Sequence, residues 1–135
     1  MTTATLKKQV VVFTDFDLNF TKHPVTNDIV TVKNDICVKR SIRNLLLTRH
    51  YARPFHSEIG CNLEALLFNP ISPLLTNALK KVITETITEF EPRVKIYDIE
   101  VNYETDNNTV NITIHFIIVN TNKPLTVEIA IQRSR

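Results

Sequence analysis

The stretch Phe90-Glu91-Pro92-Arg93 decides the fold, because the residue pattern changes from helical to extended across it. Before this stretch, apolar residues recur at three- and four-residue steps, which predicts one buried helix face: Leu75, Leu79, Val82, Ile83, Ile87 and Phe90. After it, apolar and polar residues alternate from Ile99 to Glu104, which predicts a half-buried strand. Pro92 disfavours helical geometry at Glu91 and has no N–H to donate, so we expect the helix to end near Phe90.

Glu91 and Arg93 flank Pro92, and on an extended backbone their side chains would point the same way. One interpretation is a surface ion pair that closes the turn and contributes ~0–1 kcal/mol. The other is a rigid charged surface that is presented to a partner. Under the second interpretation, Arg93→Ala would leave the isolated fold near wild type and abolish partner binding.

Size and composition predict one soluble domain with an ordinary core. The chain has 135 residues, of which 43% are hydrophobic, and its formal net charge is +2. This small charge, of interspersed sign, argues against a nucleic-acid or membrane partner. No apolar run is long enough to span a membrane, and no signal-peptide pattern opens the chain. A single glycine, Gly60, argues against nucleotide-binding folds and their cofactors, so none is expected.

The first third of the chain is predicted to be an extended N-terminal arm, residues 1–34, because it carries no helical period. Within it, Gln9–Phe13 is a strand candidate, and the stretch 9–20 could contact a neighbouring chain. An ordinary edge strand followed by a loop explains the same residues equally well.

Residues 35–135 are predicted to form the core domain, beginning with a helix from Asp35, as its cap, to about His50. The polar face of that helix is basic, which suits solvent or an acidic partner: Lys39, Arg40 and Arg43. Gly60 is expected to adopt a positive φ, and Asn62 to cap a short helix, Leu63–Phe68. Ser72 and Pro73 are start signals for the helix that ends at Phe90.

Three alternating stretches near the C-terminus predict an antiparallel meander, 94–104, 110–118 and 125–131. Together with two main helices and one short helix they predict an α+β fold, packed on three or four strands. The outer strands would leave backbone groups unpaired, so another chain could add a strand to the last one.

No catalytic pattern stands out in the sequence. Carboxylates that could serve a glycosidase are present without a recognisable cleft context: Glu58, Glu64, Glu91 and the pair Asp15/Asp17. The histidines show no metal-ligand spacing, and Cys37 and Cys61 form neither a zinc pattern nor a CxxC motif. These two cysteines are expected to be buried thiols, with a disulfide left open. The residues therefore favour a binding or structural module over an enzyme.

A series of short motifs, in this order and spacing, resembles the baseplate wedge or sheath-initiator family of contractile-tailed bacteriophages, also called the lysozyme-like wedge family: Thr14–Phe20, His23–Asp28, Ser41–Thr48, Arg53-Pro54-Phe55, Glu58–Leu63, Leu66-Leu67-Phe68 and Glu91-Pro92-Arg93. The resemblance covers nearly the whole chain from about Val12. The type VI secretion component TssE is a relative of this family.

The resemblance implies a structural role in the virion, in the inner tail baseplate, after assembly in the host bacterial cytoplasm. It implies docking on the core bundle of other wedge proteins through Glu91, Pro92 and Arg93. It also implies a sheath-like β edge that starts tail sheath assembly by strand addition, here placed on Leu125, Val127, Ile129 and Ile131. Several copies, about six, would surround the tail axis and could contact the tail tube.

Two alternatives remain at this point. One is a TssE-like baseplate component of a type VI secretion system. The other is a small peptidoglycan-cleaving muramidase that uses two of Glu58, Glu64 and Glu91.

Overall fold

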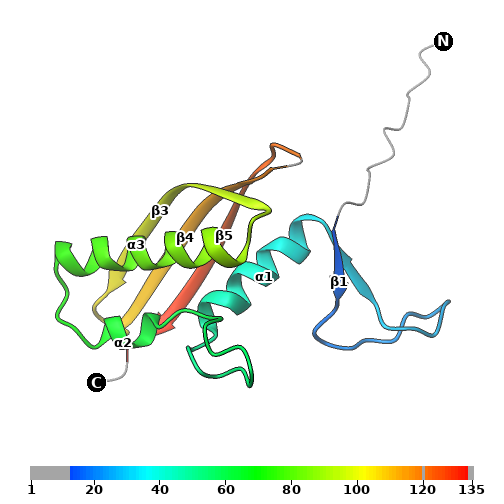
Figure 1. Cartoon of the computed structure of the whole chain (residues 1–135), viewed down its shortest axis with the longest axis horizontal. Helices are drawn as coiled ribbons and strands as arrows, with labels where there is room; N and C mark the ends of the chain where they lie inside the picture. The colour runs from blue at the N-terminus through cyan, green and yellow to red at the C-terminus, as the bar shows by residue number, and fades with distance from the viewer. Residues whose placement is uncertain (1–12, 120, 134–135) are drawn as a thin grey trace, which may run out of the picture. The chain divides into compact units, whose positions relative to one another are not determined.

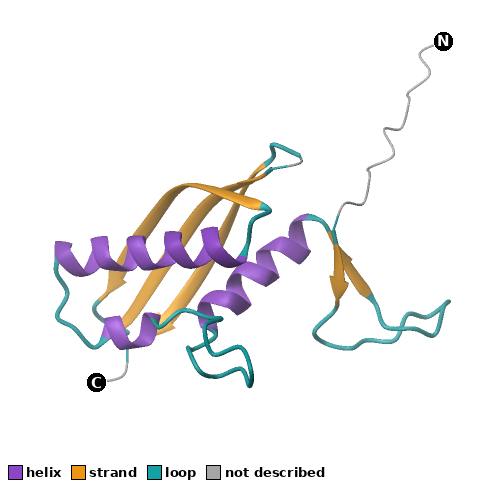
Figure 2. Cartoon of the chain, in the orientation of Figure 1, coloured by secondary structure: helices purple, strands orange, loops and turns teal. Residues whose placement is uncertain are grey.

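The structure is a computed structural model of the chain, and it describes residues 13–119 and 121–133. Helices and strands follow in the order β1 (Thr14–Phe16), β2 (Thr31–Lys33), α1 (Asp35–Leu47), α2 (Leu63–Leu67), α3 (Pro73–Phe90), β3 (Val94–Glu104), β4 (Thr109–Ile118) and β5 (Pro124–Gln132) (Figure 1; Figure 2). The fold is α+β, as the sequence predicts. The chain divides into two compact units, and the boundary between them falls within α1, between Val38 and Lys39. This boundary is four residues beyond the one expected from the sequence.

The first unit contains a small antiparallel ribbon. Strands β1 and β2 pair with Thr14 opposite Lys33, and an isolated bridge joins Lys22 to Ile29 further along the ribbon. The chain from Thr14 to Lys33 therefore folds back on itself, and the sequence did not reveal this pairing. The predicted strand Gln9–Phe13 lies outside the described residues except for Phe13, which belongs to no strand.

Helix α3 starts and ends as the sequence predicts. The hydroxyl of Ser72 accepts a hydrogen bond from the Leu75 N–H (3.2 Å), and Pro73 occupies the first turn. At the other end, the Glu91 N–H donates to the Ile87 carbonyl (2.8 Å), and the chain then enters β3. The predicted inward face is confirmed, because Leu75, Leu79, Ile83 and Ile87 are buried and Val82 and Phe90 are half-buried.

Strands β3, β4 and β5 form one antiparallel sheet with β4 in the centre, and α3 crosses it (Figure 2). The alternate apolar residues of β4 are all buried: Val110, Ile112, Ile114, Phe116 and Ile118. Burial of each such side chain stabilises the fold by about 1.5–3 kcal/mol. A bulge between Ile96 and Asp98 shifts the register of β3 and re-aligns its later residues with β4.

Some element boundaries differ from the predictions. Helix α1 ends at Leu47, before the expected His50, and Asp35 is its first helical residue rather than its cap. Helix α2 has Asn62 at the N-cap position, but the Asn62 side chain makes no capping hydrogen bond. Gly60 has φ +128°, as predicted, and a Cβ there would lie 2.5 Å from the Thr48 carbonyl oxygen.

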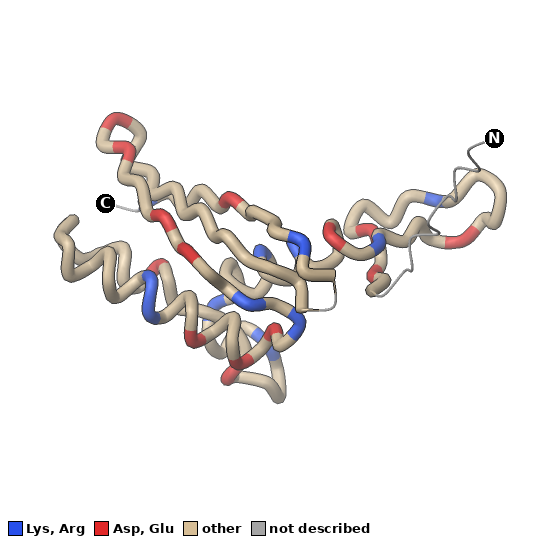
Figure 3. Tube along the Cα trace, turned by 90° about the horizontal axis from the view of Figure 1, so that it is seen from above, with Lys and Arg blue, Asp and Glu red and all other residues tan. Residues whose placement is uncertain are grey.

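Charges of both signs are interspersed along the second unit (Figure 3). Within the described residues, no helix combines the length and the apolar character needed to cross a membrane.

Candidate partner-binding surfaces

The junction between α3 and β3 holds a buried carboxylate. Glu91 is only 3% exposed. Arg93 binds it through two parallel contacts, from Nε to Oε1 and from Nη2 to Oε2 (2.7 Å). The Ser41 hydroxyl, from α1, donates a third hydrogen bond to Oε2 (2.5 Å). This one side chain therefore ties α1 to the helix-to-strand junction.

Burial alone would raise the pKa of Glu91. The hydrogen bonds from Arg93 and Ser41, together with the charge of Arg93, outweigh burial and hold that pKa below its ordinary value. The carboxylate is thus charged and paired in the folded protein. The sequence correctly suggested a pair between Glu91 and Arg93. Its placement on the surface was wrong, because the Glu91 side chain is buried and also accepts a hydrogen bond from Ser41 of α1.

The exposed part of the junction is Pro92 with part of Arg93, whose side chain is 32% exposed. The Nε–Nη2 edge of the guanidinium is occupied by Glu91, so a partner carboxylate cannot take that edge. Glu91 therefore positions Arg93 and does not itself face outward. Ser41, which completes this arrangement, was missed because it lies 50 residues away in sequence.

Strand β5 supplies the second surface. Among the described residues β5 pairs only with β4, so its other side is an edge. The four β5 residues singled out from the sequence do not face that edge with their side chains. Val127, Ile129 and Ile131 are buried on the core side, and Leu125 is half-buried. They anchor the strand, and its backbone is what remains for a partner.

Two backbone hydrogen bonds show which β5 amides face β4. The Arg133 N–H donates to the Asn108 carbonyl (2.8 Å), and the Val119 N–H donates to the Arg93 carbonyl on the opposite side of β4 (3.0 Å). Successive residues in an antiparallel ladder direct their backbone groups to alternate sides, so Val127 faces β4. The N–H and C=O groups of its neighbours Thr126 and Glu128, and of Ala130, therefore point away from β4.

The carboxylates considered for a muramidase do not share one of the described grooves. Glu58 lines a groove with Arg49 and Tyr51, and Glu64 lines another with Phe68. Glu64 forms an ion pair with Arg49, and Glu91 lines neither groove. A general acid needs a raised pKa. A backbone hydrogen bond, followed by one from His56, instead lowers the pKa of Glu58.

The other candidate residues from the sequence, two aspartates and two cysteines, have local structural roles. Asp15 caps the N–H of Phe16 (2.8 Å), and Asp17 accepts a hydrogen bond from the Thr21 hydroxyl (3.0 Å). Cys37 and Cys61 are buried free thiols. Burial raises the pKa of Cys61. No group of three potential metal ligands occurs within residues 13–119 and 121–133.

The model of the family described as baseplate wedge protein gp25 matches residues 33–123. The chain belongs to this family. The baseplate wedge protein gp25 of Enterobacteria phage T4 is 29% identical over 82 residues, which cover 61% of this chain. The match spans 62% of the length of that relative.

Three solved structures share the fold. A putative tail lysozyme from Geobacter sulfurreducens is 19% identical with a TM-score of 0.68, covering 73% of this chain and 89% of its own. A chain of the anti-feeding prophage baseplate is 15% identical with a TM-score of 0.63, and the match covers 91% of this chain and 87% of that chain. A chain of the postcontracted pyocin R2 baseplate is 14% identical with a TM-score of 0.57, and the match covers 90% of this chain and 100% of that chain.

Proposed function

We propose that this wedge-family protein is a non-enzymatic structural component of a phage tail baseplate, carried in the virion. In this role it docks on other wedge proteins through the Glu91-Pro92-Arg93 junction. It starts the tail sheath by accepting a strand from a sheath subunit on the edge of β5. The observation that carries the proposal is this edge, where core side chains fix the strand and outward backbone groups remain for a partner.

Strand addition suits β5 because anchoring and recognition use different residues. Val127, Ile129 and Ile131 bury their side chains in the core and pair their backbones with β4. Thr126 and Glu128 place their backbone groups at the edge, where an incoming strand would continue the ladder. A partner can therefore bind without displacing any core side chain.

Docking on the wedge would use the exposed part of the junction. Pro92 is a stiff apolar contact, and Arg93 is held in one orientation by the buried Glu91. Such preorganisation reduces the entropy that a long side chain loses on binding. The lowered pKa values of Glu58 and Glu91 support the non-enzymatic role, because a general acid needs a raised pKa.

The test of strand addition is co-purification of the full chain with the sheath subunit of the same tail. Glu128→Pro removes an N–H that points to the edge, and edge strands tolerate such a proline. Glu128→Ala is the matched control, because it removes the same carboxylate and keeps the N–H. Position 127 is avoided because its N–H serves the ladder with β4.

We expect wild type and Glu128→Ala to retain the sheath subunit and Glu128→Pro to lose it, with circular dichroism confirming that all three are folded. Equal retention by both variants would show that β5 is not the accepting edge. Failure of wild type to retain any sheath subunit would reject the sheath-initiating role.

A further inference from the structure

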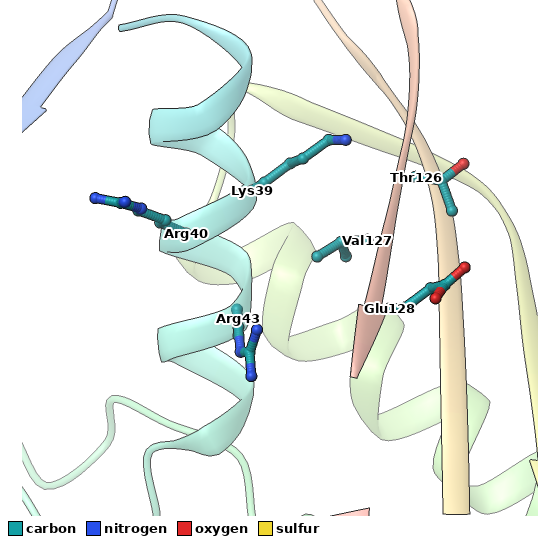
Figure 4. A pocket seen from close by; sticks show the side chains of 6 residues that line it. All are labelled: Lys39, Arg40, Arg43, Thr126, Val127 and Glu128. Atoms are coloured by element: carbon teal, nitrogen blue, oxygen red, sulfur yellow. The ribbon is translucent and has the colours of Figure 1, made fainter. Parts of the chain in front are cut away.

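The edge of β5 does not face open solvent alone, because α1 runs beside it. Between them lies an open groove of about 390 Å³, here called the α1–β5 groove, lined by Lys39, Arg40, Arg43, Thr126, Val127 and Glu128 (Figure 4). All six residues belong to the second compact unit. A strand added to β5 would therefore enter a space that has one wall of backbone and one wall of helix.

The helix wall is positively charged. Lys39 extends from α1 toward β5, whereas Arg40 points away (Figure 4). Arg43 is one turn further along, on the same face as Lys39. Within the described part of the chain, neither Lys39 nor Arg43 forms an ion pair.

The strand wall does not neutralise these charges. The side chains of Thr126 and Glu128 are directed to the far side of β5, and that of Val127 is directed toward α1 (Figure 4). The groove thus combines outward backbone donors and acceptors with two cations that form no ion pair among the described residues. An extended chain with acidic side chains would pair its backbone with β5 and its carboxylates with the cations of α1.

We infer that the α1–β5 groove selects an incoming strand that carries carboxylates at alternate positions, which pair with Lys39 and Arg43. The spacings agree. Residues four apart on a helix are separated by about 6.0 Å along its axis, and residues two apart on a strand by about 6.6–6.8 Å. Alternate side chains of a strand also share one face, so two carboxylates can meet the two cations together.

This inference rests on the proposed strand addition and gives it a chemical specificity. The backbone ladder alone accepts almost any extended sequence, whereas the cations of α1 would reject basic strands and fix the register of acidic ones. Binding would also weaken with salt, because partly exposed ion pairs are screened.

The direct test uses the isotopically labelled full chain and two soluble peptides of about eight residues. One alternates threonine with glutamate and the other alternates threonine with lysine. Amide resonances of Thr126, Glu128 and Ala130 report binding at the edge. The variant Lys39→Glu/Arg43→Glu reverses the charge of the groove, and Lys81→Glu/Lys95→Glu makes the same charge change at exposed positions on α3 and β3.

We expect the acidic peptide to shift these resonances in wild type and in the control, with about tenfold weaker binding to the reversed variant. The reversed variant should instead prefer the lysine peptide. Equal binding of both peptides, or of neither, overturns the inference. If the sheath subunit binds wild type and Lys39→Glu/Arg43→Glu equally well, strand addition stands and the acidic specificity fails. If it binds neither, the proposed function fails as well.

Discussion

Removal of the Arg93 guanidinium should destabilise the isolated protein, because it leaves the 3%-exposed Glu91 with only the Ser41 hydrogen bond described above. Breaking a buried ion pair from one side typically costs about 3–5 kcal/mol. Arg93 is itself 32% exposed, and Glu91 can relieve its burial by taking a proton, so we expect the lower end, about 3 kcal/mol. The burial of Glu91 thus replaces the sequence-based expectation that Arg93→Ala folds like wild type.

The matched control is Arg49→Ala, which breaks an ion pair with Glu64 whose side chains are 69% and 49% exposed. Exposed pairs contribute ~0–1 kcal/mol, so this variant should be near wild type. Urea unfolding followed by far-ultraviolet circular dichroism measures both free energies of unfolding. Thermal unfolding should show a fall in Tm of about 10 °C for Arg93→Ala only.

The pH dependence provides a second check. The folded pKa of Glu91 is held below its ordinary value of 4.5, so its paired state stabilises the fold above that pH. This stabilisation is lost as pH falls through the folded pKa, and the gap between wild type and Arg93→Ala should then narrow. If Arg93→Ala and Arg49→Ala lose equally little stability near pH 7, or if the gap persists in acid, the assigned role of the Glu91–Arg93 pair is wrong.

Two further predictions concern the loop that precedes α2. Gly60→Ala should lower the free energy of unfolding in urea by about 1–3 kcal/mol, because the residue has φ +128° and the new Cβ would clash with the Thr48 carbonyl oxygen. A loss below about 0.5 kcal/mol would show that the loop adapts to the Cβ without strain. Cys61 should react with a thiol reagent only on unfolding, because it is 2% exposed and burial raises its pKa; rapid modification of the native protein would contradict this, with Cys37→Ser used to isolate the signal.

The sequence by itself determined the elements whose cause is local. The three- and four-residue period before Phe90, the proline at 92 and the two-residue period after it are set by neighbours along the chain, and α3, β3 and β4 follow them. The start of α3 at Ser72 and the positive φ of Gly60 are likewise local choices, and both are present.

Only the tertiary structure decided which groups of the candidate surfaces are exposed and which are buried. The Ser41 hydroxyl donates a hydrogen bond to Glu91 across 50 residues, and the carboxylate of the expected surface pair is buried. Lys39 on α1 and Thr126 on β5 line one groove although they are far apart in sequence. Helical and strand periods specify which side of each element is apolar, but they do not specify which elements meet. The contacts between elements depend on long-range packing. They determine the charge of the α1–β5 groove and which backbone groups of β5 remain unpaired at its edge.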